Sequence, residues 1–145
     1  MQRKEQAIAL HRQQFNCSQA VFTAYRQAEV LSEQDALKLS TVLGAGVAAT
    51  GCEMCGAVSG ALLAISMRHG RGDLESIEAK TTTYALARRF MTEFASRIGS
   101  CTCEEILGMN IGTPENMEKA KAMKLLQTRC PDAIGTACDL LEEVL

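Results

Sequence analysis

Seven cysteines in a chain of 145 residues are the groups most suited to chemistry. Four of them share one feature, which is that each stands at or just before the expected first turn of a helix. They are Cys17, Cys55, Cys103 and Cys130. Free backbone N–H groups and the positive end of the helix dipole stabilise a thiolate in that position. If these helix starts converge, the pattern predicts one site of anionic sulfur that binds a metal cluster or exchanges electrons.

Close cysteine pairs offer a second kind of chemistry. Cys52 and Cys55 have the C-x-x-C spacing of dithiol redox proteins, in which one thiol resolves a mixed disulfide formed by the other. In that interpretation these two residues are the catalytic pair, and the other site cysteines are exchange partners. The strand and parallel sheet that usually surround such a motif are missing from the pattern, so a thioredoxin fold is not predicted.

The other cysteines have smaller expected roles. Cys101 stands beside Cys103, and either of them could be the third site cysteine. Cys138 follows Cys130 on the same expected helix at a separation beyond the reach of a disulfide, so it is assigned to the core. Cys52 and Cys101 are therefore expected to be auxiliary thiols.

Cys55 has the most favourable surroundings for a thiolate. It is expected at a helix N-terminus, and Gly56 leaves no side chain beside it to block a partner. Glu53 places a carboxylate nearby, but its side chain can turn towards solvent. The sequence therefore predicts that Cys55 is the most acidic thiol of the protein.

The motifs around these cysteines resemble those of a known family. Residues 55–60 (CGAVSG) resemble the central signature of the C_GCAxxG_C_C family, whose members are described as redox-active, with glycine and cysteine transposed relative to that name. Residues 16–21 (NCSQAV) resemble its first cysteine motif, 103–108 (CEEILG) its third and 130–131 (CP) its fourth. The resemblance covers nearly the whole chain, and it implies a redox protein.

Three functions fit a site of four thiols. The preferred one is electron transfer through an iron-sulfur cluster, as the resemblance to the cluster-bearing region of the related split-Soret cytochromes implies. The second is a cycle between dithiol and disulfide. The third is a structural zinc ion held by four thiolates, which ranks last because such sites more often draw ligands from closely spaced pairs. The sequence indicates no particular redox partner protein.

Composition and motifs argue against several other functions. A net charge of -2 and the lack of basic runs give no surface for nucleic acid. The segment 41–52 is rich in glycine, but it lacks the Gly-Lys-Ser/Thr ending and the preceding strand of a nucleotide-binding loop. Its glycines Gly44, Gly46 and Gly51 are instead expected to let the backbone pass close to the cysteine site.

The two histidines do not suggest an enzyme. His11 and His69 form no Ser/His/Asp arrangement, so a hydrolase is not predicted, and whether the protein is an enzyme at all stays open. A histidine on a helix face is more often structural than a metal ligand. His11 is therefore interpreted as a structural or surface residue rather than a ligand.

The elements that position the cysteines are predicted to be helices. Residues 56–67 are rich in glycine and alanine and are apolar on all sides, which is typical of a buried central helix. Gly56 and Gly60 should let a neighbouring backbone come close to it. Residues 74–98 form a long amphipathic pattern whose seam could also pair two subunits in a homodimer.

Start signals mark several further helices. Asn16 is a good N-cap, and Thr113-Pro114 predicts a helix that ends near Gln127. Cys130 followed by Pro131 predicts the start of a terminal helix. No alternating strand pattern of useful length occurs. The sequence thus predicts a single compact all-α domain over residues 1–145, with about six or seven helices around the central one.

The start of the chain and the cysteine content indicate a compartment. The charged residues 1–6 are not followed by the apolar core of a signal peptide, and the longest apolar run is shorter than the roughly 20 residues that cross a bilayer. A cytoplasmic protein without membrane insertion is predicted. Cysteines in that compartment serve metal or redox chemistry rather than a disulfide framework.

Overall fold

A computed structural model describes residues 2–145, and its regular elements are all helical. Met1, the first residue of the predicted domain, lies outside the described residues. The elements are α1 (Arg3–Arg12), α2 (Cys17–Tyr25), α3 (Glu33–Ser40), a 3₁₀ turn η1 (Thr41–Leu43), α4 (Gly56–His69), α5 (Ile77–Ile98), α6 (Cys103–Leu107), α7 (Pro114–Ala122) and α8 (Leu125–Val144). The predicted all-α class is therefore confirmed.

The described chain contains eight α-helices, so the prediction of six or seven was too low. The shortest of them is the five-residue α6, which begins at Cys103 as the sequence predicts. Thr102 caps its start by accepting a hydrogen bond from the Glu105 N–H, and Gly108 ends it in a left-handed conformation with φ of 78°. Both signals are local, and together they make this short segment a helix of its own.

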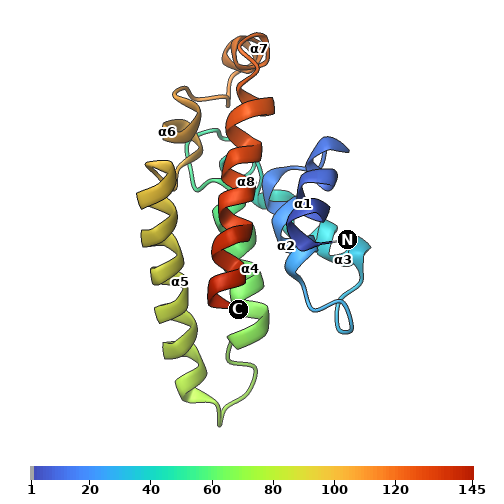
Figure 1. The fold of residues 1–145 in the computed structure, drawn as a ribbon, viewed down its shortest axis with the longest axis vertical. Coiled ribbons are helices and arrows are strands. Elements are labelled where there is room, and N and C mark those ends of the chain that lie inside the picture. Colours follow the sequence, from blue (N-terminus) through green and yellow to red (C-terminus); the bar gives the residue numbers. More distant parts are fainter. Residues whose placement is uncertain (1) are drawn as a thin grey trace.

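Three long helices form the spine of the molecule. Figure 1 shows α4, α5 and α8 running side by side, and each of them contacts the other two. The α1–α2 pair lies on the side of this group away from α5, with α2 against α4 and α1 against α8. The short helices α6 and α7 lie at the end of the spine where α8 begins. None of the helices described in residues 2–145 combines the length and the hydropathy of a membrane-crossing segment.

Helix α4 is buried along its first two turns, and its glycines face α2. A Cβ atom at Gly56 would lie 2.7 Å from the backbone nitrogen of Ser18, and one at Gly60 would lie 2.7 Å from the Ser18 carbonyl oxygen. No side chain tolerates such distances to a backbone atom, so only glycine permits this approach. The predicted close packing of the central helix through its glycines is therefore confirmed.

Aromatic and branched side chains fill the remaining core. Phe90 and Phe94 of α5 stack with ring centroids 6.0 Å apart. The Tyr25 hydroxyl donates a hydrogen bond of 3.2 Å to the Cys138 carbonyl, which ties α2 to α8. Cys138 itself is fully buried, and this confirms its assignment to the core.

Two predicted helix boundaries near the C-terminus are wrong. The helix that begins at Pro114 ends at Ala122 rather than near Gln127, and α8 begins at Leu125 rather than at Cys130. Lys124 separates them, because its left-handed conformation, with φ of 57°, breaks the helical path. The proline that was interpreted as a start signal lies inside α8 instead.

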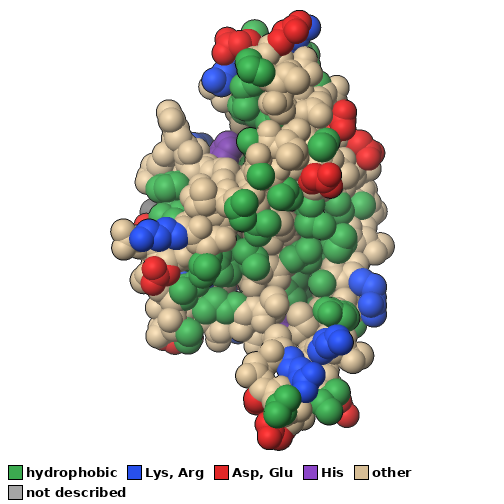
Figure 2. Space-filling model, turned by 180° about the vertical axis from the view of Figure 1, so that it is seen from behind, with side chains coloured by type: hydrophobic (Ala, Val, Ile, Leu, Met, Phe, Trp, Pro, Cys, Tyr) green, Lys and Arg blue, Asp and Glu red, His purple; other side chains and the backbone are tan. Residues whose placement is uncertain are grey.

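The predicted helix over residues 74–98 forms as α5, which begins three residues later than expected. Leu74, Ile77 and Tyr84 are exposed hydrophobic residues at its N-terminal end. On the face opposite to the view of Figure 1, hydrophobic side chains gather over the middle and charged ones lie around them (Figure 2). The homodimer through this helix stays a prediction.

Replacing Gly60 by alanine should destabilise the fold. The added Cβ would lie 2.7 Å from the Ser18 carbonyl oxygen, and overpacking costs about 1–3 kcal/mol, against the roughly 1 kcal/mol that alanine gains over glycine in a helix. We expect chemical denaturation of the reduced, metal-free protein to show a net loss of about 1 kcal/mol in the free energy of unfolding.

Gly72→Ala is the matched control for this change. Nothing lies within 4 Å of the Cβ position at Gly72, so its free energy of unfolding should stay within about 0.5 kcal/mol of the wild type. A Gly60→Ala variant as stable as this control would show that α2 and α4 do not need the close approach.

Candidate functional site

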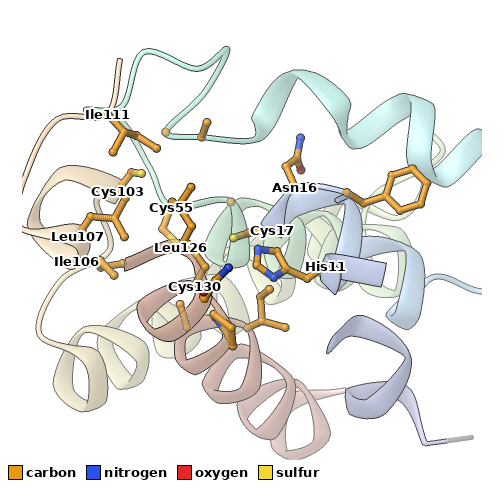
Figure 3. Close-up of a pocket in the computed structure, with 18 of the residues that line it drawn as sticks. His11, Asn16, Cys17, Cys55, Cys103, Ile106, Leu107, Ile111, Leu126 and Cys130 are labelled. Atoms are coloured by element: carbon orange, nitrogen blue, oxygen red, sulfur yellow. The ribbon is translucent and has the colours of Figure 1, made fainter. Parts of the chain in front are cut away.

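The four cysteines that were predicted to form one site line a single cavity. The cavity has a volume of about 890 Å³ and is lined by residues of α1, α2, α6, α7 and α8 and by the start of α4. Figure 3 shows Cys17, Cys55, Cys103, Cys130 and His11 around this space. The fold therefore gathers four thiols that are far apart in the sequence.

Cys17 is positioned by the cap of α2. The Asn16 side chain accepts a hydrogen bond from the Gln19 N–H at 2.9 Å, and the Gln19 side chain accepts one from the Asn16 N–H at 3.0 Å, which makes a capping box. Asn16 also donates to the Thr41 carbonyl at 3.0 Å. A Cβ at Gly44 would collide with Asn16, so this glycine lets the loop close over the cap.

Cys55 and Cys103 are held beside each other by a short antiparallel contact. The Cys55 N–H donates to the Cys101 carbonyl at 2.7 Å, and the Cys103 N–H donates to the Glu53 carbonyl at 2.9 Å, on either side of an isolated β-bridge. Cys55 is the N-cap of α4 and Cys103 is the first residue of α6. These two thiols therefore stand at helix starts, as predicted.

Cys130 reaches the cavity from within a helix. It lies in the second turn of α8, so the prediction that it stands at a helix start is wrong. Pro131 follows it and has no N–H, which leaves the carbonyl of Gln127 without its partner in the helix. Gln127 also lines the cavity. The site thus combines three helix starts with one helix interior.

His11 is a fifth potential ligand that sequence reasoning missed. Its ring nitrogen and the sulfur atoms of Cys17 and Cys130 all lie within 4.8 Å of one another. The sequence alone makes His11 a structural or surface residue, whereas the structure places it at the cavity, in the last turn of α1. The short link between α1 and the Asn16 cap is a usable signal, because it permits only a tight helix hairpin.

The Cys130 thiol is the acidic member of the group. The hydrogen bond with the Cys17 thiol and the contact with His11 together lower the pKa of Cys130 to about 6, although burial opposes them. The same contact with Cys130, together with burial, raises the pKa of Cys17. Near neutral pH the pair therefore carries a thiolate on Cys130 and a thiol on Cys17.

Burial dominates at the other two cavity thiols. It raises the pKa of Cys55 to about 11, although the backbone N–H groups of Ala57 and Val58 lower it. It also raises the pKa of Cys103 to about 12. The prediction that Cys55 is the most acidic thiol is therefore wrong, because the start of α4 stabilises a thiolate by less than burial destabilises it.

The three remaining cysteines, all within the described residues, do not line the cavity. The Cys101 thiol donates to the Met91 carbonyl at 3.5 Å, so Cys103 rather than Cys101 is the third cavity cysteine. Cys52 is exposed. A dithiol made of Cys52 and Cys55 would pair an exposed thiol with a buried one, and it stays a prediction.

A strained loop borders the cavity beside Cys103 through Ala45 and Gly46. Four non-glycine residues at positions 45 and 47–49 have positive φ angles between 53° and 65°, a conformation that costs about 1–2 kcal/mol per residue. Gly46 and Gly51 adopt it without that cost. A Cβ at Gly46 would lie 3.0 Å from the Cys103 Cβ, so the predicted close passage of the backbone is confirmed there.

Comparison with known proteins places the chain in a family. The family model described as "Putative redox-active protein (C_GCAxxG_C_C)" matches residues 15–144. The chain belongs to this family. No curated protein and no solved structure matches it. The matched segment of the C_GCAxxG_C_C family includes all four cavity cysteines, and His11 lies before its first residue.

In the reduced, metal-free protein, Cys130 should be alkylated at lower pH than Cys55. Iodoacetamide reacts with the thiolate, so the labelling rate of Cys130 should rise as pH increases through about 6 and then level off. Cys55 should require a pH near 11. Peptide mapping after brief labelling at a series of pH values measures both midpoints.

His11→Ala should move the Cys130 midpoint to higher pH, because the imidazole lowers the pKa of this thiol. His69→Ala removes a histidine that does not line the cavity and should leave the midpoint unchanged. Coincident midpoints for Cys130 and Cys55 would show that the contact with Cys17 and His11 does not stabilise the thiolate.

Proposed function

We propose that this protein transfers electrons through an iron-sulfur cluster ligated by Cys17, Cys55, Cys103 and Cys130. The observation that carries the proposal is the convergence of four thiols from four helices on one cavity (Figure 3). Four thiolates are the usual ligand set of both [2Fe-2S] and [4Fe-4S] clusters. The description of the family as redox-active supports the same function.

The spacing of the thiols favours a cluster over a single zinc ion. Zinc bonds to sulfur of about 2.3 Å hold four thiolates roughly 3.8 Å apart. Within residues 2–145, the only group of three or more His, Cys, Asp or Glu ligand atoms that all lie within 4.8 Å of one another is that of His11, Cys17 and Cys130. Cys55 and Cys103 do not join it, and ligands spread more widely suit several metal ions better than one.

The lining of the cavity suits a charged, buried group. Apolar residues such as Ile106, Leu107 and Ile111 line it and would exclude water, which helps to set the potential of a cluster. Lys121 and Lys124 also line it, and their charges would offset the negative charge of a cluster with four thiolates. When bound, such a cluster would accept and donate single electrons.

Thiol-disulfide exchange is the second candidate function, and the contact between Cys17 and Cys130 favours it. Oxidation of this pair would form one sulfur-sulfur bond and break the disulfide of a partner, which takes the two electrons, the Cys17 proton and one proton from solvent and leaves as two thiols. The thiolate on Cys130 would be the attacking group. This pair fits the exchange better than Cys52 and Cys55, because both residues line the cavity and their sulfur atoms lie within 4.8 Å of each other.

Anaerobic reconstitution with ferrous iron and sulfide tests the cluster. The wild type should gain iron, sulfide and broad visible absorbance. Each serine variant of a cavity cysteine should lose most of the bound iron, because it lacks one ligand: Cys17→Ser, Cys55→Ser, Cys103→Ser and Cys130→Ser. Cys52→Ser removes an exposed thiol outside the cavity and should bind as the wild type does.

The same samples separate the cluster from the dithiol. A wild type that takes up no iron, yet loses the mass of two hydrogens on oxidation by glutathione disulfide, would contradict the cluster. Peptide mapping of that oxidised sample should then show Cys17 joined to Cys130. Circular dichroism of every variant establishes that loss of iron is not loss of the fold.

A further inference from the structure

His11 is held beside Cys17 by the backbone of the α1–α2 hairpin. The Phe15 N–H donates to the Leu10 carbonyl at 3.2 Å, and Gln14 turns the chain with a φ of 74°. Asn16 then caps α2 directly before Cys17. This left-handed turn after a helix is a common way to end it. The position of His11 is therefore fixed by backbone hydrogen bonds rather than left to a free loop.

The three donor atoms of His11, Cys17 and Cys130 are close to the spacing of a metal site. All of them lie within 4.8 Å of one another. A tetrahedral ion with bonds of about 2.0–2.1 Å to nitrogen and 2.3 Å to sulfur needs its ligands roughly 3.5–3.8 Å apart. Side-chain rotations that bring these atoms about 1 Å closer would complete the geometry. Imidazole and thiolate are the preferred ligands of zinc.

We propose that His11, Cys17 and Cys130 form a mononuclear site for a thiophilic divalent ion such as Zn²⁺ or Co²⁺. Figure 3 shows the imidazole beside Cys17 and Cys130, with Cys103 towards the far side of the cavity. Three protein ligands leave the fourth tetrahedral position free, and all three residues line the cavity. Zinc sites of this composition bind water or a substrate atom at that position. A small thiol is the ligand class that suits such a soft ion.

This site goes beyond the proposed cluster. It uses a nitrogen ligand from outside the segment that matches the family, and it needs neither Cys55 nor Cys103. It shares two thiols with the cluster, so a single chain holds either the ion or the cluster. The ion is the occupant when iron and sulfide are scarce.

Titration of the reduced, metal-free full-length protein with Co²⁺ under anaerobic conditions tests the site. Thiolate-bound tetrahedral Co²⁺ shows charge-transfer absorbance in the near ultraviolet and d–d bands in the visible, so the spectrum reports the ligands. The wild type should bind one Co²⁺ per chain. His11→Ala should weaken binding by at least about tenfold and shift the d–d bands. Cys17→Ser and Cys130→Ser should lose most of the charge-transfer absorbance.

Matched controls separate this site from the cluster. His69→Ala removes the histidine outside the cavity and should bind Co²⁺ as the wild type does. Cys103→Ser should bind Co²⁺ within about twofold of the wild type, although it should fail in iron-sulfide reconstitution. Failure of the cluster and failure of the mononuclear site are therefore distinguishable. If His11→Ala unfolds, His11→Gln takes its place in the titration.

Three results would overturn the mononuclear site. They are a wild type without a tetrahedral Co²⁺ spectrum, a histidine variant that binds Co²⁺ unchanged, and a Cys103→Ser variant that loses Co²⁺ as fully as Cys17→Ser. The open position has its own test: addition of 2-mercaptoethanol to the Co²⁺ form should shift the d–d bands. An unchanged spectrum would mean that the protein fills the fourth position.

Discussion

The backbone contact between α2 and α4 is the constraint on which the site depends. The residues that touch are the immediate neighbours of two site residues, because Gly56 follows Cys55 and Ser18 follows Cys17. Bringing these backbones together therefore places Cys17 and Cys55 at the same cavity. Glycine in a helix costs roughly 1 kcal/mol relative to alanine. Burial of the alanine and valine residues around these glycines offsets that cost.

A cavity that gathers four thiols has to limit its negative charge. The neighbouring sulfurs contribute to raising the pKa of Cys17 and Cys103, so of the four cavity thiols only Cys130 ionises near neutral pH. A bound metal changes this balance, because its positive charge favours the thiolate form and releases the protons. The arrangement therefore suits a site that becomes anionic as its metal binds.

Local signals explain what could be predicted from the sequence. The Asn16 cap, the Thr113-Pro114 start and the glycines of the central helix each depend on residues within a turn or two. Cys130 was misplaced because Pro131 is typical of a first turn, whereas packing of α8 against its neighbours carries the helix through it. His11 was missed because its role depends on how α1 folds back on α2. The acidity of Cys55 was misjudged for a similar reason, because burial is a property of the whole fold.

The central claim is that one cavity holds iron through four thiols. Crystals of protein isolated without oxygen, measured just above and just below the iron absorption edge, test this claim most directly. The account predicts iron anomalous density inside the cavity, within bonding distance of the Sγ atoms of Cys17, Cys55, Cys103 and Cys130. A cavity without iron density, or iron bound elsewhere on the chain, would contradict it.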